Sequence, residues 1–134
     1  MLGKRKPKKG LQQKAEVVKL LKVADVNMLE DITRYLMHNI GNRTTPSSIA
    51  NTMVSKKRKI DARTVDRYIR GLTDSLLLYE ARRYNIKGKE LLNSISKYYV
   101  CDVAMRNMLV RGKDSDIGHI LENLVYLELC RKRV

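Results

Sequence analysis

Apolar residues recur at helical spacing along the first part of the chain. Residues 26–40 carry apolar side chains three and four positions apart, and Asp25 or Asn27 precedes them in a position to cap a helix. Gly41 follows and supplies a C-terminal stop. A weaker helical pattern, interrupted by lysines, covers residues 11–23. The pattern therefore predicts two helices before residue 42.

Two further helices are predicted in the next part of the chain. Thr45 followed by Pro46 is typical of a helix start with proline at the first position, and this short helix ends near Lys56. Asp61 can cap a longer helix at residues 61–75. The inward positions of that helix are Val65, Tyr68, Ile69 and Leu72, and its outward positions are Arg63, Thr64, Arg67 and Arg70.

The pattern changes after residue 75. Residues 76–84 form an apolar run followed by alternation, which is typical of a strand that leaves the core, and residues 97–101 predict a second strand. A short segment at residues 90–92 lies between them. A short helix at residues 102–109 and a last helix at residues 117–133 complete the predicted elements.

The order of these elements predicts the fold class. Three helices followed by a two-stranded hairpin is the order of a winged helix-turn-helix. We therefore expect a mainly α fold, a winged helix-turn-helix with extra N- and C-terminal helices. Its expected parts are a basic disordered leader at residues 1–10, a winged-helix domain at residues 11–101 and a C-terminal helical extension at residues 102–134.

The 134-residue chain is strongly basic. It has 28 Lys and Arg against 14 Asp and Glu, which gives a net charge of +14, while 43% hydrophobic residues make it too apolar for a disordered tail. Polyanions are the expected partners, nucleic acid first and an anionic membrane second. The charge concentrates at residues 4–9 and 56–59. For the first cluster, a solvated N-terminus is the alternative to a binding arm.

The sequence argues against an enzyme. The glycines form no phosphate-binding spacing, and no serine has a plausible His and Asp arrangement around it. Cys101 and Cys130 are far apart and lack a CxxC partner. We therefore expect no catalysis, no cofactor and no metal. The sequence contains no transmembrane run and no secretory signal, so the expected location is cytoplasmic, without membrane contact.

The basic residues have a mechanism in such a fold. The third helix enters the major groove, and the wing reaches the adjoining backbone. The alternative is a solvated charged face on a fold used for protein contacts. The predicted nucleic-acid-binding residues are Lys56, Lys57, Arg58, Lys59, Arg63, Thr64, Arg67, Arg70, Arg82, Arg83, Lys87 and Lys89.

An ordered series of motifs adds a family resemblance. Over about residues 12–131 the chain resembles the C-terminal region of a large family of archaeal and bacterial AAA-type P-loop ATPases. The motifs are LMHNIGN at residues 36–42, SIA at 48–50, TVDRYI at 64–69, RYNIKGK at 83–89, KYYVCDVAMRN at 97–107 and GHILENLVYLEL at 118–129.

The resemblance implies a recognition or regulatory module. The family places an ATPase core before this region and a nuclease-like fold of the restriction-endonuclease type after it, and this chain has neither the Walker motifs nor the later acidic strands. Glu122 matches a helix glutamate of that fold without its companions, and residues 103–105 depart from the family, which shows a glycine there.

We expect a non-enzymatic module that binds DNA. The alternative is a protein-interaction or dimerisation module that docks on an ATPase or on a second copy, and a weaker alternative is a fragment of a metal-dependent nuclease-like domain. The last helix has an apolar stripe wider than a surface helix needs. It predicts a homodimer, unless the helix folds back over the wing. The predicted dimer interface is Ile117, Ile120, Leu121, Leu124 and Leu127.

Overall fold

The computed structural model describes residues 25–88, 90–111 and 116–133. The predicted leader, the predicted helix at residues 11–23 and Lys89 lie outside these residues. The elements are α2 (Val26–His38), β1 (Arg43–Thr44), α3 (Pro46–Ser55), α4 (Ala62–Asp74), β2 (Leu78–Asn85), β3 (Glu90–Val100), α5 (Val103–Leu109) and α6 (Ile117–Lys132).

Four of the helices start at capping residues. The side chains of Asp25, Asp61 and Asp102 each accept a backbone N–H of the first turn, at 2.9, 2.7 and 2.9 Å. Thr45 forms a reciprocal capping box with Ser48, and Pro46 occupies the first helical position. Each such cap contributes about 1 kcal/mol. The sequence predictions for these helix starts are confirmed.

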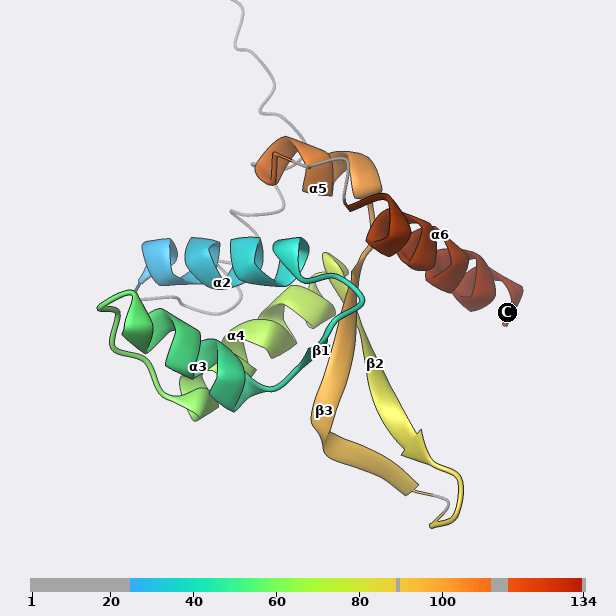
Figure 1. The fold of residues 1–134 in the computed structure, drawn as a ribbon, viewed down its shortest axis with the longest axis horizontal. Coiled ribbons are helices and arrows are strands. Elements are labelled where there is room, and N and C mark those ends of the chain that lie inside the picture. The colour runs from blue at the N-terminus through green and yellow to red at the C-terminus, as the bar shows by residue number, and fades with distance from the viewer. Residues whose placement is uncertain (1–24, 89, 112–115, 134) are drawn as a thin grey trace, which may run out of the picture.

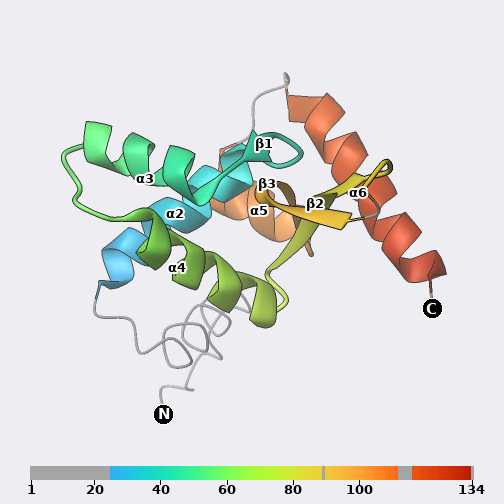
Figure 2. The ribbon, with the colours of Figure 1, turned by 90° about the horizontal axis from the view of Figure 1, so that it is seen from below.

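Three antiparallel strands form one sheet in the order β1-β3-β2. The hairpin of β2 and β3 pairs from Leu78 and Val100 outward and has an irregularity at Arg82 and Arg83. Figure 1 shows α2, α3 and α4 grouped on one side of the sheet, with the hairpin extending away from them and α6 on the other side. The view from below in Figure 2 gives the same arrangement.

The predicted fold class, a mainly α winged helix-turn-helix, is wrong. The described residues combine five helices with a three-stranded antiparallel sheet, a mixture of α and β. β3 is 11 residues long and includes residues 90–92, which the apolar pattern had separated from the strand. β1 has only two residues, too few for any alternation to reveal it.

One core holds the described helices and the sheet together. It includes fully buried Ile32 of α2, Ile49 of α3, Val65 of α4 and Val100 of β3. All four predicted inward positions of α4 are buried, which confirms the helical periodicity. Burying side chains of this kind contributes about 1.5 to 3 kcal/mol each.

The edge of β3 that faces β1 is covered in three successive ways. β1 pairs with Ser96 and Lys97. The backbone N–H of Gly41, in a left-handed conformation at φ +74°, donates to the carbonyl of Tyr98 at 3.0 Å. Asn123 of α6 then binds both backbone groups of Val100, at 2.8 and 2.9 Å. The strand edge therefore ends in a side chain from a distant helix instead of in open solvent.

Candidate nucleic-acid interface

The exposed face of α4 is the centre of the candidate interface. Its other face is anchored in the core, so Arg63, Arg67 and Arg70 project into solvent. These arginines follow the i, i+4, i+7 spacing that lines one side of a helix. Arg67 also lies 5.6 Å from the centroid of the Tyr68 ring. The fold thus holds three guanidinium groups on one rigid element.

Basic residues continue on both sides of α4. In both views α4 lies between the α3–α4 loop, which carries Lys56, Lys57 and Lys59, and the β2–β3 hairpin (Figures 1 and 2). These three lysines are exposed, and Lys57 has a positive φ of 60° at the end of α3. Between residues 56 and 88 the sequence has ten basic and four acidic residues. A polyanion approaching this part of the surface meets a net positive field.

Three of the predicted binding arginines have acidic neighbours. Arg58 is directed to α2, where its guanidinium lies 3.8 Å from Asp25 and 3.4 Å from Asp31. Arg70 pairs with Asp66 at 2.9 Å, and Arg82 lies 3.4 Å from Glu80. Arg58 therefore ties the α3–α4 loop to α2, and we leave it out of the proposed contact surface.

The remaining predicted cations are better placed to meet an anion. Among the described residues no ion pair is made by Lys56, Lys57, Lys59, Arg63, Arg67, Arg83 or Lys87. On the hairpin, Arg83 and Lys87 are exposed beside Tyr84, which is 53% exposed. A free guanidinium or ammonium group loses no existing partner when it binds phosphate.

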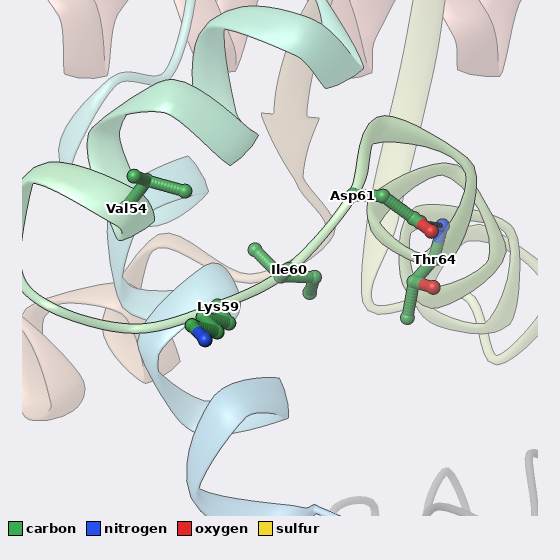
Figure 3. Close-up of a pocket in the computed structure, with 5 residues that line it drawn as sticks. All are labelled: Val54, Lys59, Ile60, Asp61 and Thr64. Atoms are coloured by element: carbon green, nitrogen blue, oxygen red, sulfur yellow. Dashed lines mark hydrogen bonds between the residues drawn. The ribbon is translucent and has the colours of Figure 1, made fainter.

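A shallow hollow marks the start of α4. Figure 3 shows it between Val54 of α3, Lys59 and Ile60 of the loop, and Asp61 and Thr64. The backbone N–H of Thr64 donates to Asp61, and this bond holds the pKa of the Asp61 carboxyl below its usual range. Because a carboxylate already occupies this helix N-terminus, an anion is not favoured there. Half-buried Thr64 thus serves the cap, and the exposed arginines of α4 remain the candidate contacts.

A second polar cluster joins α6 to β3. Glu122 accepts a hydrogen bond of 2.8 Å from Lys97 and one of 2.6 Å from the hydroxyl of Tyr99, and the Tyr99 ring stacks on Tyr126 with centroids 4.1 Å apart. Sequence reasoning missed these contacts. It noted Glu122 only through the family resemblance. Its carboxylate is engaged in holding α6 to the sheet.

The Glu122 cluster makes the docking of α6 depend on pH. The hydrogen bonds from Lys97 and Tyr99 hold the pKa of Glu122 below its usual range. The resulting stability is therefore present above the unfolded pKa of about 4.3 and is lost as pH falls through the folded pKa. Since the Glu122 side chain is 41% exposed, we expect Glu122→Gln to lower the free energy of unfolding at pH 7 by less than about 1 kcal/mol.

Urea unfolding of the wild type and Glu122→Gln at pH 7 and at about pH 3 tests this prediction. The difference between the two proteins should shrink at the lower pH. A difference that stays constant or grows on acidification would contradict the assigned role of Glu122.

The described residues were expected to hold neither a metal site nor a membrane-spanning helix. Among these residues no three or more His, Cys, Asp or Glu side chains form a group that could hold a metal ion. None of the helices described is both long and apolar enough to cross a membrane.

Most of the chain matches a known protein family. Residues 13–116 match the family described as "Domain of unknown function (DUF8612)". The chain belongs to this family. The matched residues of this DUF8612 domain run from before α2 to just before α6, so they include α4, the α3–α4 loop and the hairpin.

Two relatives are considerably longer than this DUF8612 chain. An uncharacterized protein of Haemophilus influenzae is 32% identical over 110 residues, which cover 82% of this chain and 28% of the relative. An uncharacterized protein of Methanocaldococcus jannaschii is 28% identical over 117 residues, which cover 87% of this chain and 26% of the relative. The chain thus spans little more than a quarter of the length of these relatives. No solved structure matches it.

Proposed function

We propose that this chain binds duplex DNA through a surface made of α4, the α3–α4 loop and the β2–β3 hairpin. The observation that carries the proposal is the pair of exposed arginines on α4, Arg63 and Arg67, which make no ion pair with any described residue and are fixed one helical turn apart by a buried opposite face. A rigid helix of this kind fits the major groove, which is about 12 Å wide. Arginine suits both phosphates and the edge of guanine.

The flanking cations support the same proposal. Lys56, Lys57 and Lys59 lie at one side of α4, and Arg83 and Lys87 lie on the hairpin at the other. Contacts to phosphates from both sides would orient α4 on the duplex, while the helix itself contacts the bases. The sequence also predicted four further residues in the interface: Lys89, Thr64, Arg70 and Arg82. Arg70 and Arg82 have first to leave their carboxylate neighbours, so we expect smaller contributions from them.

Replacement of Arg63, Arg67 and Arg83 by alanine is the direct test. If Arg63 and Arg67 contact bases and Arg83 contacts a phosphate, each lost base contact should weaken binding by about 1 to 3 kcal/mol, and the slope of log affinity against log salt should become shallower by about 1. The measurement is fluorescence anisotropy with a duplex of about 20 base pairs, repeated at several salt concentrations from about 50 mM upward. A single strand of the same sequence shows whether the helical form is required.

The matched control removes the same three charges elsewhere. Arg34 on α2 and Arg131 and Lys132 on α6 are exposed and lie outside the proposed surface. Their replacement by alanine should leave most of the affinity and of the salt slope intact. Equal losses in the two triple variants, or no binding by the wild type near 50 mM salt, would reject the interface.

The other functional expectations have less support. Because the relatives are far longer, the region works within larger chains there, and the resemblance to AAA-type ATPases stays a prediction. The nuclease alternative relied on Glu122, whose carboxylate is already bound by Lys97 and Tyr99. We therefore propose no catalytic role for it. The interaction alternative has an observation of its own in α6, given below.

A further inference from the structure

α6 differs from an ordinary surface helix, which buries its apolar side and exposes its polar side. Polar contacts hold the side that faces the sheet: Asn123 is fully buried and binds the backbone of Val100, and Glu122 and Tyr126 contact Tyr99. Its apolar side faces solvent. That side consists of Ile117, Leu121, Leu124, Val125 and Leu129, which are between 49% and 66% exposed.

Rotation of α6 cannot hide this apolar side. Turning the helix would pull Asn123 away from Val100 and leave a buried N–H and a buried carbonyl without partners. The alternative, in which the helix folds back over the wing and buries its stripe, is therefore not met for these five residues. Ile120 and Leu127, which were predicted in the dimer interface, are half-buried. Val125 and Leu129 take their places on the exposed face.

The exposed face has the symmetry of a self-complementary surface. Ile117, Leu121, Val125 and Leu129 follow one another at intervals of four, so the spacing of the row is the same from either end. An antiparallel copy would place Ile117 opposite Leu129 and Leu121 opposite Val125, with each pair occurring twice. A two-fold dimer needs this kind of matching, because the same patch must serve both subunits.

Charge favours the antiparallel orientation over the parallel one. The C-terminal end of α6 carries exposed Arg131, Lys132 and Arg133, of which Arg131 and Lys132 lie 2.7 and 4.0 Å from Glu128. A parallel pair would bring two such ends together, each with three cations and one carboxylate. An antiparallel pair separates them by the length of a 16-residue helix, about 24 Å, and also opposes the two helix dipoles.

We propose that the apolar face of α6 binds a second copy of this chain in an antiparallel, two-fold symmetric contact. The face is smaller than the roughly 800 Å² per partner of a standard interface, so the dimer is weak and in exchange with the monomer. Because two strongly basic chains repel one another, salt strengthens this dimer. Salt weakens the proposed binding to DNA, so the two proposals can fail independently.

Sedimentation of the full chain over about 1 μM to 1 mM tests the association. The wild type should shift from monomer to dimer, and the double variant Leu121→Glu/Val125→Glu should need at least tenfold higher concentration. The milder pair Leu121→Ala/Val125→Ala, which keeps the helix, should show the same trend. Ile86→Glu, at an 82% exposed hairpin position, is the matched control and should associate like the wild type.

Disulfide trapping tests the orientation in a background where Cys101 and Cys130 are replaced by serine. Chains carrying Leu121→Cys and chains carrying Val125→Cys are mixed and oxidised. The antiparallel contact predicts that the mixed disulfide dominates over either like pair. Three results would overturn the proposal. The wild type could stay monomeric at every concentration, the Leu121→Glu/Val125→Glu variant could associate as strongly as the wild type, or disulfides between identical variants could dominate.

Discussion

Replacing Arg106 by methionine should lower the free energy of unfolding by about 3 kcal/mol, which is the low end of the cost of breaking a buried ion pair. Arg106 has no exposed surface. Its Nε donates to the carbonyl of Met37 at 2.8 Å, and its guanidinium binds Asp116 at 3.0 Å. The low end applies because Asp116 is 23% exposed and regains water when its partner is lost.

Urea unfolding measures the effect, and two companion variants sharpen it. Arg34→Met makes the same chemical change at an exposed position of α2 and should alter stability by no more than about 0.5 kcal/mol. Asp116→Asn should be destabilising in the wild type but nearly neutral once Arg106 is gone, because the two side chains act as a pair. Additive losses in the double variant would show that Arg106 acts through packing and its hydrogen bond to Met37, and not through Asp116.

Arg106 also joins parts of the chain that the sequence keeps far apart. One side chain connects α5 to the end of α2 and to the residue that precedes α6. Loss of the Arg106 contacts should release the start of α6. The Arg106→Met variant is therefore expected to show faster backbone amide hydrogen exchange in α6 than in α4.

Local patterns predicted the helices well for a physical reason. A cap and a helical repeat are each written within a few residues, so Asp61 and the buried series beginning at Val65 could be found without tertiary information. The same reasoning placed the exposed arginines of α4 on its outer side. What it could not show is which cations have carboxylate neighbours, because Arg58 pairs with Asp25 and Asp31 across a gap of more than 25 residues.

The sheet and α6 were harder to predict because their signals are long-range or unusual. β1 exists only through its pairing with β3, since two residues have no pattern of their own. In α6 the apolar stripe was found, but the pattern left open whether the helix folds back over the wing. The buried Asn123 fixes its orientation, because its amide can satisfy a strand edge and a leucine cannot.

Replacing Asn123 by leucine should therefore be as damaging as losing Arg106. The leucine is similar in size, but the backbone N–H and carbonyl of Val100 would remain buried without partners. Each unsatisfied group costs about 1 to 3 kcal/mol, so we expect a total loss of about 2 to 6 kcal/mol, or detachment of α6 where this exposes the two groups to water. Asn51→Leu, the same change at an exposed position of α3, should have an effect of no more than about 0.5 kcal/mol.

Hydrogen exchange at the Val100 amide separates the Asn123 contact from general destabilisation. Val100 lies at the inner end of the β2–β3 hairpin and is fully buried. If Asn123 binds the N–H of Val100, the Asn123→Leu variant should lose exchange protection at the Val100 amide. The amides of α4, on the other side of the sheet, should keep the protection that the global stability of the variant allows. Unchanged protection at Val100, with α6 still docked, would mean that the sheet edge does not depend on the asparagine amide.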